Sequence, residues 1–190
     1  MERDLIKEVN ELRRNPAAYA KKLETNKGYF KKEKVNGKFI WKHPDAERGL
    51  QTEEGPAAYD EAISFLRKAK SVPALVASKG LNKVAADFLV EYQKDPDANV
   101  PIDEVVDRYG KLEGSFKRMV QFGSPTAELV VVHLFVCDGD KSRGYREVLL
   151  SPTLKQIGVA HGSHDSYRQC SVIVECDKFE NTIDGDDRAF

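Results

Sequence analysis

The stretch "KQIGVAHGSHDSYRQCSVIVECDKF", residues 155–179, decides the fold because it holds two strand-like runs separated by a polar turn. Runs of this composition, bounded by turn residues, predict two neighbouring strands. In "CSVIVEC" the period-two alternation places Cys170, Val172, Val174 and Cys176 on one face of the second strand. Because that apolar face needs cover, we expect this strand to lie inside a sheet.

The three cysteines, Cys137, Cys170 and Cys176, form a sparse and odd-numbered set, which argues against a disulfide-dense scaffold. Six residues of extended chain separate Cys170 from Cys176 by about 20 Å, so these two thiols cannot pair. We expect all three to be small buried hydrophobes. A disulfide from Cys137 to one of the others stays open for an oxidising compartment.

Helical patterns dominate the chain before this hairpin. Leu5, Val9 and Leu12 form one stripe, and Asn15 and Pro16 then restart the helix as its cap and first turn. Further helices are predicted from Pro56 onwards, over the stripe from Leu81 to Tyr92, and from Ile102 to Gly110.

The run "LVVVHLFV", residues 129–136, is rich enough in β-branched residues to suit a strand, but Ser124, Pro125 and Glu128 before it favour a helix. His133 falls on an apolar stripe of that helix, so we interpret it as a core histidine bonded to a neighbour. The following stretch, "CDGDKSRGYREVLLSP" at 137–152, predicts an acidic turn and a short amphipathic helix ended by proline.

Residues 26–55 interrupt the helical pattern, and "YFKKEKVNGKFIWK" within them predicts a hairpin turning at Asn36 and Gly37. Its lysines alternate with aromatic residues, which suits RNA binding. We favour the plainer interpretation, in which the aromatics pack on the domain and the lysines are solvated. The lysines are Lys31, Lys32, Lys34, Lys38 and Lys42, and the aromatics are Tyr29, Phe30, Phe39 and Trp41.

The bulk composition limits the function classes. A chain of 190 residues suits one domain, and 30 basic against 31 acidic residues give no general attraction for nucleic acid or anionic membranes. No apolar run reaches the roughly 18 residues of a membrane span, and the charged start is unlike a signal peptide. No P-loop, dinucleotide or G-x-S-x-G motif occurs.

The candidate metal ligands also lack a complete pattern. No two histidines have the i, i+4 spacing of a zinc helix; His161 and His164 flank a turn that suits a surface loop, with weak metal binding as the alternative. The acidic groups Asp138/Asp140 and 184–187 lack the spaced oxygens of a calcium loop. Nothing pairs a nucleophile with a base. We therefore predict no metal, no cofactor and no catalytic residue.

Taken in order, three segments resemble the CAP superfamily, also called the SCP-like or antigen 5/pathogenesis-related-1 domain, and most closely its shorter, disulfide-poor branch in bacteria and protists. The resemblance implies an α+β fold, a three-layer α/β/α sandwich with a small antiparallel sheet. It places one domain at 1–179, with an inserted loop or hairpin at 26–55 and an acidic tail at 180–190. The segments are "VNELRRNPAAYAKKL", "QTEEGPAAYDEAISFLRKAKSVPALVASKGLNKVAADF" and "DRYGKLEGSFKRMVQFGSPTAELVVVHLFVCDGDKSRGYREVLLSPTLKQIGVAHGSHDSY".

Many members of that family place two histidines and two acids in a shallow cleft that can bind zinc. Here the family's Gly-His-Arg is similar to Gly144-Tyr145-Arg146, and its Gly-Glu-Asn, before the first core strand, to Lys117-Arg118-Met119. The other histidine is missing from "KDPDANVP", and only Asp138 is retained in kind. The resemblance thus implies a degenerate metal tetrad, because one acid cannot hold zinc.

We expect Arg118 to pair with Asp138 beside Tyr145, with His164 completing a rewired cleft that binds without catalysis. The ligand would be a small apolar or lipid-like molecule, as the resemblance suggests, or a protein partner. A hydrolase that uses the cleft through Tyr145, His164 or a cysteine is the alternative, and RNA binding by the hairpin is the second. The resemblance implies secretion, whereas the absence of a leader and the few cysteines leave a cytoplasmic location open.

Overall fold

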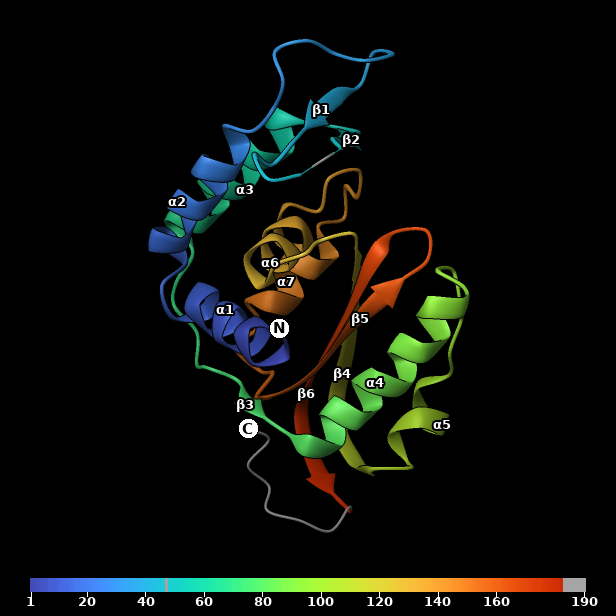
Figure 1. Cartoon of the computed structure of the whole chain (residues 1–190). Helices are drawn as coiled ribbons and strands as arrows, with labels where there is room; N and C mark the ends of the chain where they lie inside the picture. Colours follow the sequence, from blue (N-terminus) through green and yellow to red (C-terminus); the bar gives the residue numbers. More distant parts are fainter. Residues whose placement is uncertain (47, 183–190) are drawn as a thin grey trace.

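The computed structural model describes residues 1–46 and 48–182. Helices and strands are mixed along the chain, and the two strands at its end follow each other directly (Figure 1). The helices are α1 (Glu2–Arg14), α2 (Pro16–Lys27), α3 (Pro56–Lys68), α4 (Lys79–Lys94), α5 (Ile102–Val106), α6 (Ala127–Val136) and α7 (Gly144–Leu149). The strands are β1 (Phe39–Trp41), β2 (Leu50–Thr52), β3 (Val76–Ala77), β4 (Gly110–Phe122), β5 (Gln156–His164) and β6 (Arg168–Asn181).

The main sheet has the order β3-β5-β6-β4, so β6 lies between two long partners. Both of its pairings are antiparallel, whereas the two-residue strand β3 runs parallel to β5. The predicted strand pair 155–179 is confirmed, and so is its place inside the sheet. Cys170, Val172, Val174 and Cys176 all have no exposed surface, as the alternation predicted, and the three cysteines carry free thiols.

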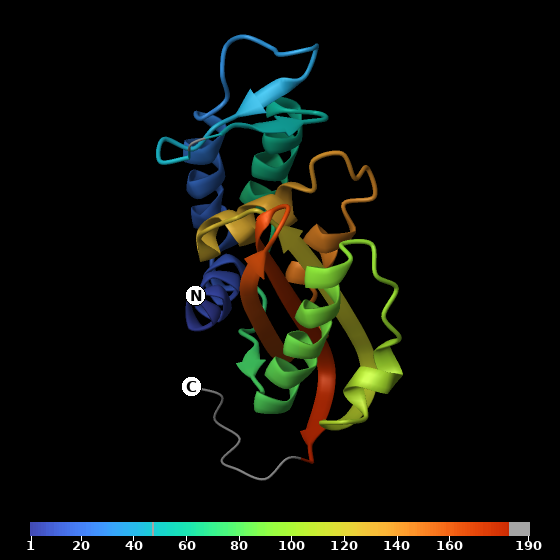
Figure 2. The same cartoon turned by 45° about the vertical axis from the view of Figure 1, so that its right-hand side comes forward.

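Helices cover both faces of this sheet, which confirms the predicted α+β class with three layers (Figure 2). α4 and α5 pack on the face that holds the apolar alternation of β6. α1 and α6 pack on the other face, around Met119, Ile157 and Ile173, with α2 and α3 outside them. Each face therefore buries its own apolar core.

The predicted helix boundaries follow their caps. Asn15 ends α1 and starts α2, and its side chain accepts a hydrogen bond from the backbone N–H of Ala18 at 3.2 Å. The run 129–136 is confirmed as a helix, α6, although Thr126 rather than Ser124 is its cap, accepting from Leu129 N–H at 3.3 Å. A strand-like composition becomes helical here because the helix is buried almost all round, where packing outweighs propensity.

The inserted region turns at Asn36 (φ 50) and Gly37 (φ 78), as predicted, with a bridge from Val35 to Lys38. The two arms also meet in a bridge from Phe30 to Trp41, and β1 pairs in addition with β2, which begins at Leu50. Trp41 is only 5% exposed, and its indole N–H donates to Asn26 O at 2.7 Å. The ribbon is thus anchored to α2 by its one tryptophan.

Two sequence-based expectations need correction at the sheet. Residues 110–122 form the long strand β4, which the pattern did not predict, and Lys117 to Met119 lie within this strand rather than before the first core strand. Strand β6 continues through Glu180 and Asn181, so the predicted tail 180–190 starts inside the sheet. Most of that tail, including Asp184, lies outside the described residues.

Candidate functional site: a cleft beside β4

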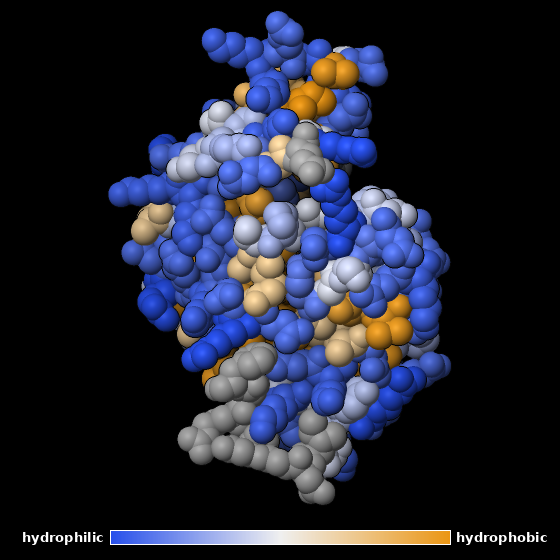
Figure 3. Space-filling view, viewed as in Figure 1, coloured by the Kyte–Doolittle hydropathy of each residue, from blue (hydrophilic) through white to orange (hydrophobic). Residues whose placement is uncertain are grey.

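A cavity of about 430 Å³ opens where β2, the end of β4, the end of α6 and the start of α7 meet. Its wall is mostly apolar, and the charged residues that line it are all acidic: Glu53, Asp138 and Asp140. The face shown in Figure 3 is mainly hydrophilic, with small hydrophobic groups over α4 and near the top. The apolar lining used below consists of Trp41, Leu50, Tyr59, Val120, Phe122 and Tyr145.

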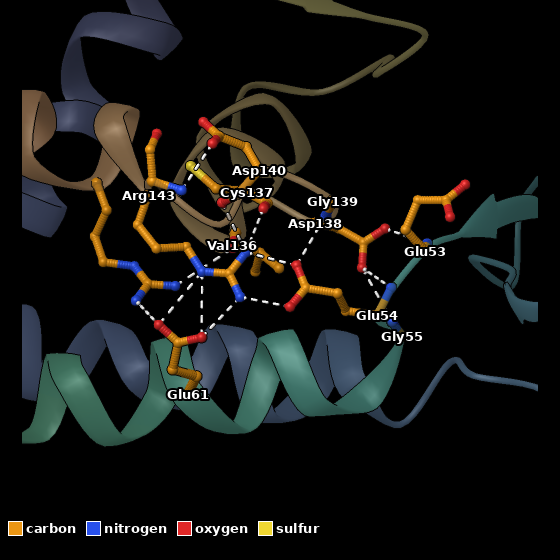
Figure 4. Close-up of polar contacts among 12 residues, drawn as sticks. Glu53, Glu54, Gly55, Glu61, Val136, Cys137, Asp138, Gly139, Asp140 and Arg143 are labelled. Atoms are coloured by element: carbon orange, nitrogen blue, oxygen red, sulfur yellow. Dashed lines mark hydrogen bonds and ion pairs between the residues drawn. The ribbon is translucent and has the colours of Figure 1, made fainter.

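Asp138, the retained acid of the resemblance, binds the backbone of the turn that leads into α3. Its Oδ1 accepts from the backbone N–H groups of Glu54 at 2.9 Å and Gly55 at 3.0 Å, and its Oδ2 accepts from Glu53 N–H at 2.6 Å (Figure 4). Both carboxylate oxygens are therefore directed at backbone N–H groups of residues 53–55, which immediately precede α3. Asp138 therefore links the 137–143 loop to the segment that leads into α3.

The predicted ion pair between Arg118 and Asp138 is wrong. Arg118 donates instead to Val100 O at 3.0 Å, and its guanidinium carbon lies 4.4 Å from the centre of the Phe88 ring. The reason is topological: Arg118 points from β4 to the face that α4 covers, whereas Asp138 follows α6, which covers the opposite face. The cation is held by an aromatic ring and a carbonyl in place of a carboxylate.

The arginines of the Arg-Gly-Tyr-Arg step brace the same loop onto α3. Arg143 binds Glu54 through two nitrogens, at 2.7 and 2.8 Å, and reaches Glu61 at 2.7 Å (Figure 4). Arg146, only 3% exposed, donates to Glu61 at 2.8 Å and to Phe135 O at 3.2 Å. Hydrogen bonds from Arg143 lower the pKa of both glutamates, with Arg146 adding to the effect at Glu61.

Tyr145 stands between these two arginines in sequence and lines the cavity that they brace. It also lines a second cavity of about 470 Å³, which contains Lys117, Arg118 and Glu147. The structure therefore brings Tyr145 beside Asp138 in the first cavity and beside Arg118 in the second, although those two do not meet. Tyr145 is the shared wall between an acidic, apolar cavity and a more basic, polar one.

His133 is a cavity residue that the sequence analysis placed only in the core. The expected neighbour contact is present, since its Nδ1 lies 2.9 Å from Ser124 Oγ. Its ring meets Trp41 edge to face at 4.9 Å, and burial lowers its pKa to about 4, so it is neutral near pH 7. Its Nε2 is buried without a hydrogen-bond partner among the described residues. The sequence signal that could have placed His133 at the cavity is its position on the helix that leads directly into the 137–140 turn.

His164 lies apart from this cleft. Its Nδ1 accepts from the backbone N–H groups of Ser166 at 3.1 Å and Tyr167 at 3.2 Å, closing the turn between β5 and β6. Its ring packs against Phe122 at 5.3 Å, behind the cavity wall. It is not among the residues that line either cavity. The turn contacts give it a structural role.

The groups needed for nucleophilic chemistry are not activated. Burial raises the pKa of Cys170 to about 11 and of Cys176 to about 12, and it also raises the pKa of Cys137, so all three stay protonated thiols near pH 7. Ser124, the hydroxyl beside His133, is 2% exposed. Over residues 1–46 and 48–182, no three His, Cys, Asp or Glu side chains gather in a way that suits a metal ion. None of the helices in these ranges is long and apolar enough to cross a bilayer.

Comparison with known proteins adds little beyond the general shape. No protein-family model matches the chain, and no curated protein matches it. Among solved structures, it is similar to an outer surface protein from Borrelia burgdorferi, with 13% identity and a TM-score of 0.47 over 56% of this chain and 80% of that one. It is also similar to a cysteine-rich secretory protein from Staphylococcus aureus subsp. aureus Mu50, with 12% identity and a TM-score of 0.45 over 79% of this chain and 67% of that one. At these scores, neither likeness carries a conclusion about this chain.

Proposed function

We propose that this protein binds an uncharged, apolar or lipid-like ligand in the cavity beside β4 and performs no chemistry on it. One observation carries the proposal: the cavity wall is apolar, while the charged groups at its rim are bonded to the protein itself. Asp138 is occupied by three backbone donors, and the side chain of Glu53 pairs with Lys38. A cavity of about 430 Å³ lies within the size range of small-molecule sites.

The charge of the wall limits the ligand. Glu53, Asp138 and Asp140 are its charged residues, and no lysine or arginine belongs to the lining. His133 is neutral near pH 7 because its pKa is lowered to about 4. A carboxylate or phosphate in the cavity would therefore meet only acidic neighbours. An uncharged headgroup, such as an alcohol, suits the site better than a fatty acid.

The likeness of the chain to the CAP superfamily supports the same interpretation. In that resemblance Tyr145 replaces a cleft histidine, and Arg118 replaces an acid. Here Arg118 faces α4 and Asp138 is committed to α3, so neither side chain is available to a metal in the cavity. We propose that the chain is a member of the disulfide-poor branch of that superfamily and that it has lost the metal tetrad.

The sole tryptophan supplies a direct test, because Trp41 lines the cavity. A long-chain primary alcohol with a terminal bromine should quench Trp41 fluorescence saturably, since bromine quenches only at close range. The bromine-free alcohol should compete and cause no quenching of its own. Absence of saturable quenching would overturn the proposal.

A matched pair of variants locates the binding. Leu50, at the cavity, is 50% exposed, and Val90, on α4, is 47% exposed, so a glutamate at either position disturbs the core little. Leu50→Glu should weaken the alcohol about tenfold, because it sets a charge beside the apolar ligand. Val90→Glu should bind as the wild type does. Equal weakening by both variants would place the ligand elsewhere.

For the two other functions considered, the observations are less favourable. The Ser124 hydroxyl lies 2.9 Å from His133 Nδ1, but Ser124 is only 2% exposed. Hydrolysis would need an activated nucleophile, and the cysteine thiols are buried and protonated. RNA binding by the ribbon would need exposed rings, whereas Trp41 is buried and Tyr29 and Phe30 pack on the core. The Phe39 ring is also covered from within the ribbon, because the Lys34 ammonium lies 4.0 Å from its centre.

A further inference from the structure

The outer edge of β4 is open. β4 ends the sheet order, with β6 on one side and no strand on the other among the described residues (Figure 1). Apart from Gly110 and Met119, each of its residues is half-buried or exposed. A bulge between Glu113 and Phe116 bends the lower part of the strand, but pairing with β6 is regular from Phe116 to Phe122.

The register shows which backbone groups face outward. Gly123 N–H donates to Gln169 O at 2.9 Å, so the alternate residues Gln121, Met119 and Lys117 exchange hydrogen bonds with β6. The residues between them, 116, 118, 120 and 122, direct their N–H and C=O groups away from β6. Phe122 O accordingly accepts from the Gln121 side chain at 2.6 Å. Within residues 1–46 and 48–182, no hydrogen bond occupies the backbone groups of Phe116, Arg118 or Val120.

Both cavities follow this edge in succession. Val120 and Phe122 belong to the apolar cavity, Lys117 and Arg118 belong to the second cavity, and Tyr145 belongs to both. A strand laid along 116–122 would thus have free hydrogen-bonding groups beside it and two different cavities for its side chains. This is the arrangement by which sheet edges recognise extended peptides.

We propose that the outer edge of β4, from Phe116 to Phe122, binds an extended segment of another protein, which adds to the sheet as a fifth strand. The segment carries an apolar side chain for the first cavity and an acidic residue for the end near Lys117. Lys117 is exposed, and the second cavity has two cations, Lys117 and Arg118, against one acid, Glu147; Glu113 on β4 is already paired with Lys178 at 3.0 Å. Charge complementarity therefore favours an acidic partner at that end.

A second copy of this chain is a poorer occupant. Antiparallel pairing of two β4 strands centred on Arg118 would set Arg118 opposite the Arg118 of the second copy and place the two Lys117 side chains diagonally across the pair. Like charges opposite each other in a sheet are destabilising. The charge that attracts an acidic peptide thus protects the edge against self-association.

The probe is a fluorescein-labelled nine-residue peptide of alternating valine and threonine with aspartate at both ends, followed by fluorescence anisotropy. Two further versions carry N-methyl groups, one on the odd-numbered amides and one on the even-numbered amides. A peptide in a strand presents alternate amides to opposite edges, so one methylated version should lose about tenfold or more in affinity and the other little. Equal binding of both methylated versions, or no binding of the parent peptide, would overturn the inference.

The protein offers a matched pair for the same test. Val120 pairs with Val172 without sharing a hydrogen bond with β6, so Val120→Pro removes only a donor that faces outward. It should weaken the peptide about tenfold, whereas Val120→Ala, which keeps the N–H, should change binding by no more than about threefold. Exchanging aspartate for lysine in the peptide should weaken it, and Lys117→Glu should reverse that preference. Unchanged binding to a folded Val120→Pro would contradict strand addition.

The inference rests on the proposal that the cleft binds without catalysis, and the two fail separately. Quenching of Trp41 by the alcohol without peptide binding would overturn strand addition alone. Peptide binding without quenching would overturn the apolar ligand alone. Sedimentation showing a dimer that Val120→Pro dissociates would assign the edge to a second copy and would also contradict the inference.

Discussion

The two walls of the cleft use their residues in opposite ways. On the wall formed by the 137–146 loop and α3, Asp138, Arg143 and Arg146 are fully engaged with donors and acceptors of the protein. On the wall formed by β4, the backbone from Phe116 to Val120 has free outward-facing groups, beside Tyr145 and an apolar hollow. The charged side chains therefore hold the 137–146 loop against α3, whereas the wall formed by β4 is the one that we propose for binding.

This difference shows how the structure uses the residues that the family resemblance aligns with a metal site. A carboxylate that accepts three backbone N–H groups stabilises the turn before α3, and it has little capacity left for a ligand. Buried arginines with several acceptors hold loops together in the same way. Function in this cleft is therefore expected from shape and backbone rather than from titratable groups.

The largest effect should come from breaking the braced wall at Arg146. Arg146→Met strands the carbonyl of Phe135 and removes a partner of Glu61, and should lower the free energy of unfolding by about 3 kcal/mol. Arg67→Met is the control: Arg67 is 62% exposed and pairs with Glu24 at 2.6 Å, so its loss should cost less than about 1 kcal/mol. Urea unfolding measures both. Similar effects at the two sites would mean that the wall is not braced.

The stability contributed by the buried acid Glu175 should depend on pH in the opposite sense to that contributed by Glu54 and Glu61. Burial raises the pKa of Glu175 to about 8, although Arg13 lies 4.0 Å away and opposes the shift, and its oxygens have no hydrogen-bond partner among the described residues. The folded state then holds a proton that the unfolded state releases above about pH 4.5, so stability falls as pH rises from there to about 8. Glu54 and Glu61, with lowered pKa values, contribute stability that is present at neutral pH and lost on acidification.

Glu175→Gln isolates this contribution. The variant should gain about 2 kcal/mol relative to the wild type between pH 5 and about pH 6.5, because the wild type loses about 1.4 kcal/mol per pH unit while only its folded state keeps the Glu175 proton. Unfolding free energies across that pH range provide the measurement, with Glu180→Gln, on the exposed end of β6, as the control. A wild type whose stability does not fall toward pH 8 would contradict the raised pKa.

A smaller effect is expected at Asp138. Asp138→Asn keeps the side-chain shape but weakens the acceptance of three N–H groups, and should cost about 1 kcal/mol, as for the loss of hydrogen bonds to a charged group. Because Arg118 bonds to Val100 and Phe88 instead, the double variant with Arg118→Met should show additive losses. A coupling of more than about 1 kcal/mol in this double-mutant cycle would restore the ion pair that the structure lacks.

Much of the fold was accessible from sequence. Caps and periodicity identified α1, α2, α4 and the strand pair at 155–179, because each has a local signal. The strand β4 was not predicted because only two of its 13 residues are buried and because it mixes Gly114, lysines and Glu113, so no period-two pattern appears. Its identity as a strand depends on its pairing with β6, which is not a local property.

The site was predictable only in part. Asp138 and Tyr145 do line one cavity, because both follow the same turn in sequence. Arg118 lies on the opposite face of the sheet, and His164 closes a distant turn, because sheet topology separates them. Trp41 and His133 were assigned to packing, and nothing local shows that the β1–β2 ribbon and α6 meet over β4.

The central claim is that Asp138 supports the cleft while the apolar wall binds, and the dissociation constant of the brominated alcohol tests it most directly. Trp41 quenching should be measured in parallel for the wild type, Asp138→Asn and Leu50→Glu, at a temperature where all three are folded. The account predicts a constant within about threefold of the wild type for Asp138→Asn and about tenfold weaker binding for Leu50→Glu. A folded Asp138→Asn that loses as much affinity as Leu50→Glu would contradict it.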